Sequence, residues 1–204
     1  MLNKVRIAVL VSGGGTNLQA LIDAQNSGIL RSGEIVTVIA SKPGVYALER
    51  AKNAGIPTAV ACKKELGSQE AFEAKIREAI EASGAELIVL AGFLSILSED
   101  FTRRFPKRIL NVHPALIPSF CGAGYYGLRV HEAALAKGVK VTGATVHFVN
   151  EIPDGGEIIE QKAVRVEPGD TPELLQRRVM EQAEWVILPA SVEKVSEQIR
   201  KGEL

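Results

Sequence analysis

The sequence predicts an α/β protein with a doubly wound, Rossmann-like sheet that is mostly parallel and gains antiparallel strands in the C-terminal half. Three observations support this prediction. Short, continuously apolar runs alternate with helical patterns in the first half, as in strands covered on both faces by helices. A glycine-rich segment directly follows the first apolar run, where such folds bind ligands. The second half shows two strand-like stretches on either side of a turn signature.

The elements of the first half follow from the spacing of its apolar residues. Continuous apolar runs predict parallel strands at residues 5–11, 35–40, 87–91 and 109–112. Apolar residues at helical spacing predict helices at residues 18–26, 47–54 and 71–81. Strand and helix therefore alternate as in βαβ units.

The second half is different in kind. A helix is expected near residues 130–137. Residues 142–149 and 157–166 then predict two antiparallel strands, joined across Pro153–Gly156, whose Pro-Asp-Gly-Gly sequence is an ordinary turn signature.

Two helix starts carry capping signals. Thr171 precedes Pro172, and proline is favoured at the first helical position, so the last helix should begin there with Thr171 as its N-cap. Thr16, followed by Gln19, fits a capping box that would fix the start of the first helix.

Composition limits the classes of protein. The 204 residues suit one domain, and 24 basic residues balance 24 acidic ones, so no bulk field attracts nucleic acid or an anionic membrane. Cys62 and Cys121 lie far apart and form no Cys-x-x-Cys pattern, which argues against a disulfide framework or a zinc site. No apolar run is long enough to span a bilayer and no targeting signal is visible, so a cytoplasmic location is expected.

The glycine-rich segment Ser12–Asn17 lies between a predicted strand and a predicted helix. Glycine N–H groups can surround an anion there, and the helix N-terminus adds favourable partial charge, so the segment predicts a phosphate site; a turn without a ligand is the alternative. The dinucleotide pattern fails because Leu18 stands where its third glycine is required. A literal Gly-x-Gly-x-x-Gly at residues 122–127 follows no strand and is interpreted as a loop.

Asn111 and His113 lie two residues apart at the end of a predicted strand, so their side chains should project from one face. Pro114 holds His113 in an extended conformation. An amide can donate to a developing oxyanion, and an imidazole can donate to it or shuttle a proton near neutral pH, so the pair suits a carbonyl reaction without a metal. A hydrogen-bonded structural histidine is the alternative for His113, as an ordinary turn residue is for Asp154.

The other two histidines show no metal-ligand spacing. His131 and His147 pair neither with each other nor with two carboxylates in a known pattern. His147 is equally compatible with a packed strand residue.

Four segments together carry a resemblance to a known family. They are GGGTNLQA at residues 13–20, AGF at 91–93, NVHPALIP at 111–118, and VHFV at 146–149 with DGG at 154–156. In order and spacing they resemble the phosphoribosylglycinamide formyltransferases (glycinamide ribonucleotide transformylases) of the formyl-folate transferase superfamily, over nearly the whole chain. The resemblance implies the formyltransferase fold as a single domain over residues 1–204. Residues 1–105 would form its phosphate-binding half, and residues 106–204 its catalytic and folate-binding half.

The resemblance also implies a reaction. 10-Formyltetrahydrofolate, as co-substrate, would donate its formyl group to the amino group of glycinamide ribonucleotide in de novo purine biosynthesis. The products would be formylglycinamide ribonucleotide and tetrahydrofolate. No metal is implied, the partners would be small molecules rather than nucleic acid or membrane, and the oligomeric state stays open.

The resemblance assigns roles to residues by motif. Asn111 and protonated His113 would stabilise the oxyanion, while Asp154 would pair with His113, raise its pKa and help relay the proton. The ribonucleotide would be bound by Ser12, Gly13, Gly14, Gly15, Thr16, Asn17 and Glu184. The folate would be bound by Phe93, Leu94, Leu97, Asn111 and Val149.

Some positions depart from the family pattern. Gln69 and Ser95 stand where many members carry a basic residue, and Cys121–Arg129 is longer than in many members.

Some rival functions share the core of this family. A methionyl-tRNA formyltransferase is disfavoured by length and zero net charge. A formyltetrahydrofolate hydrolase would carry a regulatory domain before the core. A non-catalytic phosphate-binding module has no need for the Asn111, His113 and Asp154 set.

Overall fold

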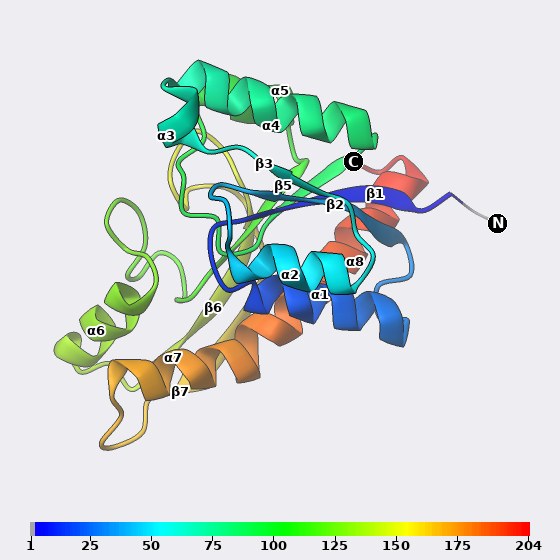
Figure 1. The fold of residues 1–204 in the computed structure, drawn as a ribbon. Coiled ribbons are helices and arrows are strands. Elements are labelled where there is room, and N and C mark those ends of the chain that lie inside the picture. The colour runs from blue at the N-terminus through cyan, green and yellow to red at the C-terminus, as the bar shows by residue number, and fades with distance from the viewer. Residues whose placement is uncertain (1–2) are drawn as a thin grey trace.

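Seven strands form one sheet in the computed structural model, which describes residues 3–204 (Figure 1). The strands are β1 (Val5–Val11), β2 (Gly33–Ala40), β3 (Thr58–Val60), β4 (Leu87–Leu90), β5 (Ile109–His113), β6 (Val141–Phe148) and β7 (Ile158–Arg165). Their spatial order is β3-β2-β1-β4-β5-β6-β7. The first five strands pair in parallel, and β6 and β7 are antiparallel to their neighbours. The predicted fold class is confirmed.

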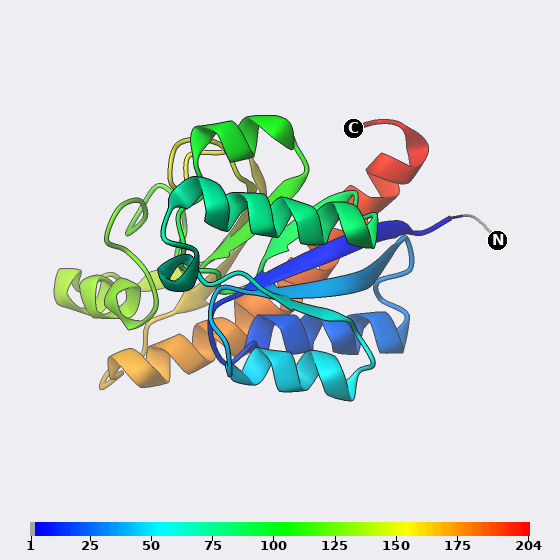
Figure 2. The same cartoon turned by 45° about the horizontal axis from the view of Figure 1, so that its top comes forward.

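Helices cover both faces of this sheet (Figure 2). They are α1 (Thr16–Ser27), α2 (Tyr46–Asn53), α3 (Lys63–Leu66), α4 (Gln69–Ser83), α5 (Glu99–Arg104), α6 (Leu128–Lys137), α7 (Pro172–Val179) and α8 (Trp185–Lys201), with a π-helical turn, η1 (Met180–Glu184), between the last two. The larger apolar core joins α1, α2, α7 and α8 to one face. Phe72 and Ile76 of α4 and Phe101 of α5 belong to the smaller core on the other face. No described helix is long and apolar enough to cross a membrane.

The predicted elements are present, with small shifts at their ends. The strand predicted at residues 5–11 has those bounds, and the one predicted at 109–112 extends by one residue to His113. The hairpin strands β6 and β7 end within one residue of the predicted bounds. Apolar spacing therefore located the elements well.

Three short elements were not predicted: β3, α3 and α5. The edge strand β3 has three residues, none of them buried, so no apolar run marks it. The four residues of α3 and the six of α5 are too few to show helical periodicity. Such elements depend on what they pack against.

The two capping predictions had opposite outcomes. Thr171 caps α7 as predicted, since its side chain accepts a hydrogen bond from Leu174 N–H. The capping box at Thr16 is wrong, because Thr16 is already the first helical residue and the cap position belongs to Gly15. Gly15 has a φ of 72°, a left-handed conformation that glycine adopts without strain.

The strand order determines where a ligand can enter. From β1 the chain runs outward to β2 and β3, then crosses back so that β4 lies on the other side of β1. Ligands in open α/β sheets bind beyond the carboxyl ends of the strands at such a reversal. The segments after β1, β4 and β5 meet at this edge.

Candidate active site

A cleft of about 380 Å³ lies at this edge of the sheet. Its lining includes the start of α1, the segment after β4, the end of β5, the hairpin turn and the π-helical turn. Of the predicted site residues it is lined by Asn17, Phe93, Leu94, Asn111, His113, Asp154 and Glu184. An adjoining hollow of about 130 Å³ shares Phe93, Asn111 and Asp154 with it and adds the predicted folate residues Leu97 and Val149. Residues far apart in sequence thus form one continuous site.

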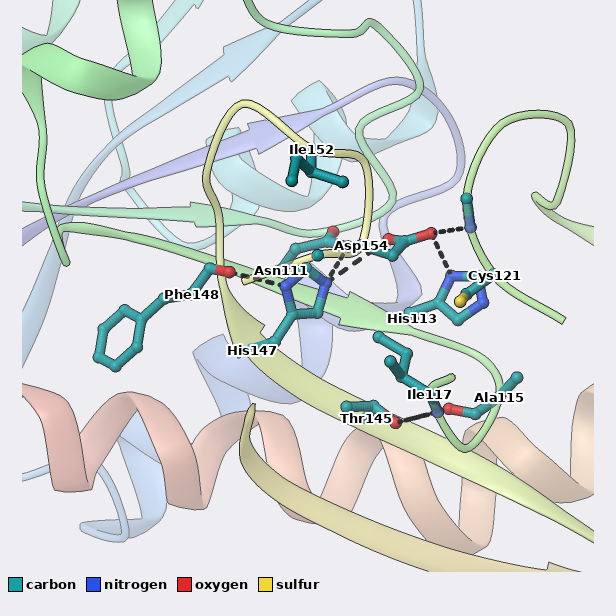
Figure 3. Close-up of polar contacts among 12 residues, drawn as sticks. Asn111, His113, Ala115, Ile117, Cys121, Thr145, His147, Phe148, Ile152 and Asp154 are labelled. Carbon is teal, nitrogen blue, oxygen red and sulfur yellow. Dashed lines mark hydrogen bonds and ion pairs between the residues drawn. The ribbon is translucent and has the colours of Figure 1, made fainter. Parts of the chain in front are cut away.

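Asn111, His113 and Asp154 come together as the motif suggested (Figure 3). Asn111 and His113 are on β5, and the hairpin turn brings an oxygen of Asp154 to 3.5 Å from Nδ1 of His113. Nε2 of His113 lies 2.8 Å from the carbonyl oxygen of Phe120. A carbonyl only accepts, so Nε2 carries a proton and Nδ1 is the nitrogen that faces the carboxylate.

The protonation state of His113 differs from the expectation. Burial lowers the pKa of this imidazole and His147 adds to the lowering, while the charge of Asp154 and the hydrogen bond to Phe120 raise it. The net pKa lies below the ordinary value of 6.5. Asp154 raises the pKa of His113, as expected, but burial is the largest effect and the net pKa is lowered, which differs from the expectation of a protonated His113.

For Asp154, the contacts with neighbouring groups outweigh the effect of burial on the pKa. Burial would raise the pKa of its carboxyl group, but the contact with His147, the hydrogen bond from Gly122 N–H and the nearby His113 lower the pKa below its usual value. The bond from Gly122 N–H measures 2.8 Å. Asp154 is therefore an ionised carboxylate beside a neutral histidine at pH 7.

The hairpin turn that carries Asp154 has a strained backbone. Asp154 has a φ of 57°, in the left-handed region that aspartate tolerates better than most residues. Gly156 approaches the carbonyl of Phe148 so closely that a Cβ there would lie 1.7 Å from the carbonyl oxygen. The Gly-Gly pair after Asp154 thus lets the turn fold back over β6.

Sequence reasoning missed four groups of this site. The Phe120 carbonyl and the Gly122 N–H bind His113 and Asp154, so the loop before α6 is connected directly to the site. His147 on β6 lies beside Asn111, and Thr145 holds the turn after His113. The only signal for the two β6 residues was strand alternation, and it does not show which residue of β5 each one faces.

Thr145 shows how the turn after β5 is held. Its hydroxyl is fully buried and donates to the carbonyl of Ala115 at 2.7 Å. It accepts from Ile117 N–H at 3.1 Å and from the side chain of Gln161 at 3.0 Å. Three hydrogen bonds to one hydroxyl fix the chain just beyond His113.

The glycine loop lies beside the cleft rather than in its lining. Arg50 Nε and Ala47 N–H of α2 donate to the carbonyls of Gly14 and Gly13. A Cβ at either of these two glycines would meet nothing within 4 Å, so an open space surrounds them. The hydroxyl of Ser12 accepts from Leu94 N–H and bonds Ser41, so it braces the loop.

Glu184 and Asn17 form a buried polar pair at one wall of the cleft. Asn17 Nδ2 donates to the Glu184 carboxylate at 2.7 Å. Burial raises the pKa of Glu184, and the bond from Asn17 opposes this only in part. Glu184 ends the π-helical turn, and such turns, which insert one extra residue into a helix, are frequent at functional sites.

Ser95 and Gln69, the two positions that depart from the family pattern, lie in different surroundings. Ser95 lines both hollows of the site. The side chain of Gln69 donates to Glu73 and to the carbonyl of Ile96 and accepts from Lys63. Among the described residues, no lysine or arginine lines either hollow.

A larger hollow of about 550 Å³ lies elsewhere, between α1 and α8. Its lining includes Thr16 and Trp185 but none of Asn111, His113 and Asp154. The smaller cleft is the better candidate, because a carboxylate, an imidazole and an amide line it, whereas no imidazole lines the larger hollow. Residues 3–204 contain no group of three His, Cys, Asp or Glu that could hold a metal ion.

Comparisons with known proteins identify the family of this chain. Residues 5–191 match the formyl transferase family. The chain is 42% identical to the phosphoribosylglycinamide formyltransferase of Haemophilus influenzae over 192 residues, 94% of this chain and 87% of that protein. It is 47% identical to the trifunctional purine biosynthetic protein adenosine-3 of Gallus gallus over 95% of this chain, but it spans only 19% of that longer protein. The crystal structure of glycinamide ribonucleotide transformylase 1 from Symbiobacterium toebii superposes with a TM-score of 0.88 at 41% identity, covering 95% of this chain and 88% of that one.

Proposed function

The chain belongs to the formyl transferase family, and on that premise we propose that it transfers the formyl group of 10-formyltetrahydrofolate to the amino group of glycinamide ribonucleotide. The products are formylglycinamide ribonucleotide and tetrahydrofolate, in de novo purine biosynthesis. The observation that carries the proposal is the convergence of Asn111, His113 and Asp154 on one cleft at the end of β5. An oxyanion donor beside a histidine–carboxylate pair suits attack on a carbonyl carbon.

The glycine loop is proposed to bind the phosphate of the ribonucleotide. The N–H groups of Gly13, Gly14 and Gly15 donate to no other described residue, and α1 begins at the next residue. Free N–H groups at a helix N-terminus attract an anion. Thr16 begins α1 at this position, and Ser12 supports the loop from behind.

Asn17 and Glu184 are proposed to bind the middle of the ribonucleotide. Both line the cleft between the glycine loop and Asn111. The Asn17 Oδ1 atom is buried and has no hydrogen-bond partner within residues 3–204, and the Glu184 carboxylate can accept from ribose hydroxyl or amine groups. A ligand that donates hydrogen bonds here satisfies groups that the free protein leaves partly unpaired.

The folate is proposed to occupy the second hollow and its shared border. Phe93, Leu97 and Val149 supply apolar surface, and Asn111 lies where the two hollows meet. Leu94 is 58% exposed at the rim, where an apolar ring can cover it. A mostly apolar slot with a few placed polar groups is typical of sites for flat organic ligands.

In the proposed reaction the amine attacks the formyl carbon, a C–N bond forms, and the carbonyl electron pair moves onto oxygen. Asn111 donates a hydrogen bond to this oxyanion. His113, neutral in the free protein, takes up at Nδ1 the proton released by the attacking nitrogen, directly or through water, and Asp154 stabilises the imidazolium. The proton then passes to the folate nitrogen as its bond to the formyl carbon breaks and the carbonyl re-forms.

The two halves of the chain are proposed to divide these tasks within a single domain. Residues 1–105 supply the glycine loop, Asn17 and the apolar wall around Phe93. Residues 106–204 supply the reacting groups and the folate residues Asn111 and Val149. Glu184 is the exception, because this residue of the second half reaches across to Asn17.

The test is direct. Purified protein is mixed with 10-formyltetrahydrofolate, with and without glycinamide ribonucleotide, and tetrahydrofolate release is followed together with the mass of the ribonucleotide. The proposal requires release that depends on the ribonucleotide and a product heavier by one formyl group. Release without the ribonucleotide would indicate a hydrolase, and no release would indicate a binding module.

A further inference from the structure

His147 lies in the site, yet the reaction described above assigns it no role. It faces Asn111 across the β5–β6 pairing and is only 1% exposed. Its two ring nitrogens contact different groups (Figure 3): Nδ1 lies 2.8 Å from the carbonyl oxygen of Phe148, and Nε2 lies 3.2 Å from Nδ2 of Asn111. A buried imidazole with both nitrogens engaged is held in one orientation.

These two contacts determine the tautomer of His147. The carbonyl of Phe148 can only accept, so Nδ1 must carry a proton. The amide nitrogen of Asn111 can only donate, so Nε2 must accept with its lone pair. The pattern fits a neutral ring with its single proton on Nδ1.

The tautomer in turn determines how the amide of Asn111 points. With the amide turned over, its oxygen would face the Nε2 lone pair, and two acceptors would oppose each other. The hydrogen bond to His147 uses one of the two N–H groups on Nδ2. The second N–H remains available on an amide that borders both hollows of the site.

We propose that His147 is a positioning residue for the reaction: by accepting from Asn111, it orients that amide so that its second N–H donates to the formyl oxygen. The inference rests on the proposed formyl transfer. Preorganisation is what makes an oxyanion donor effective, because an amide free to rotate would present its oxygen to the developing negative charge for part of the time.

The positioning role requires that Nε2 of His147 carry no proton, and a carboxylate lies close to this nitrogen. One oxygen of Asp154 lies 3.5 Å from Nε2 of His147, and the same carboxylate pairs with His113. A proton on Nε2 would be attracted to Asp154 and would leave the Asn111 donor without an acceptor.

The proposal therefore requires one tautomer, which nitrogen NMR of ¹⁵N-histidine-labelled protein at pH 7.5 can detect. The spectrum should show a protonated Nδ1 and an unprotonated Nε2 for His147. A doubly protonated ring would overturn the proposal without any activity measurement.

The kinetic test uses two substitutions of His147. His147→Phe keeps a flat ring in the buried space but removes the acceptor, so we expect kcat to fall by about tenfold to a hundredfold, with KM for both substrates nearly unchanged. His147→Gln offers an oxygen about where Nε2 lies, and should keep kcat within a few-fold of the wild type. Equal losses in the two variants, with equal thermal stability, would contradict the proposal.

A double-mutant cycle separates positioning from general structural support. If His147 acts through Asn111, then adding His147→Phe to Asn111→Ala should lower kcat no further. Additive losses would show that His147 acts on something else. The matched control is His131→Phe, the same change at a buried histidine on α6 whose ring nitrogens bond no described group; it should keep wild-type kcat.

Failure of this inference is distinguishable from failure of the proposed function. Wild-type protein that transfers the formyl group while His147→Phe keeps full turnover removes only the positioning role. Wild-type protein that transfers no formyl group removes the function. The NMR result still decides the tautomer in that case, and it also decides the proposal if His147→Phe does not fold.

Discussion

At the residue scale, the chemistry depends on one donor, one base and one carboxylate whose protonation states are set by burial. Asn111 has no charge to lose, so its effect depends on direction alone. His113 is neutral because burial outweighs the charge of Asp154, while Asp154 is ionised because two imidazoles and a backbone N–H contact it. The pair is thus prepared to take up a proton.

Replacing Asn111 by alanine tests the oxyanion role. We expect Asn111→Ala to lower kcat at least a hundredfold while KM changes little, because the lost donor, worth on the order of 3 kcal/mol, acts on charge that exists only in the transition state. Steady-state kinetics with both substrates measure this. Near-native turnover would remove Asn111 from the mechanism.

Replacing Glu184 by glutamine should separate stability from binding. The folded state raises the pKa of Glu184, so the ionised carboxylate is disfavoured in the fold above that pKa. Glu184→Gln keeps an acceptor for Asn17 without the buried charge, so the melting temperature at pH 8 should rise. The KM for the ribonucleotide should also rise, because a neutral amide accepts hydrogen bonds more weakly. A lower melting temperature would contradict this account.

At the element scale, the glycine loop shows that neighbouring glycines serve different purposes. Gly15 packs against α2, where an added Cβ would lie 2.7 Å from the Cβ of Ala47, and its φ is positive. Gly14 has open space around it and no positive φ. One glycine is needed by the fold, and the other leaves room for a ligand.

The pair Gly15→Ala and Gly14→Ala tests that division. Gly15→Ala should lower the free energy of unfolding by about 1–3 kcal/mol, since it combines left-handed strain with a backbone clash. Gly14→Ala should leave unfolding nearly unchanged and raise the KM for the ribonucleotide. Denaturant unfolding and steady-state kinetics measure the two effects. Equal destabilisation by both changes would be inconsistent with the observed spacing.

The chain just after β5 is held by a threonine hydroxyl of β6. Thr145→Val keeps the shape of a buried side chain but leaves Ala115 and Ile117 without their hydrogen-bond partner. The free energy of unfolding should fall by about 1–3 kcal/mol. Denaturant unfolding measures the loss. The control is Thr142→Val on the same strand, which should cost less because the buried Thr142 hydroxyl bonds no described group.

At the scale of the whole molecule, buried histidines link folding to pH. Burial, together with the neighbouring His113, lowers the pKa of His131 from 6.5 to about 4. Between these two values the unfolded chain binds a proton that the folded chain does not, so the free energy of unfolding falls as pH falls through this window. The lowered pKa of His113 acts in the same direction.

The corresponding measurement is the free energy of unfolding as a function of pH. From pH 7 to pH 4 it should decrease, with His131 contributing roughly 3 kcal/mol. The variant His131→Phe should lose much of that slope and keep the part due to His113. An unchanged slope would mean that His131 is not the group that titrates.

The sequence by itself determined the parallel strands, the hairpin, and the positions of Asn111, His113 and the glycine loop. These are local features: apolar runs, two-residue strand alternation and glycines beside a helix start are all visible within a few residues. The turn carrying Asp154 was equally visible, although its side chain had an ordinary explanation until it was seen with the others.

Only the tertiary structure decided which groups these residues meet. The contact of His147 with Asn111 depends on the register between β5 and β6, and the contacts of Phe120 and Gly122 depend on how a long loop folds back. The protonation state of His113 was also decided only by the tertiary structure. Its motif indicated a carboxylate partner, but the depth of burial that lowers its pKa is a property of the whole packed molecule.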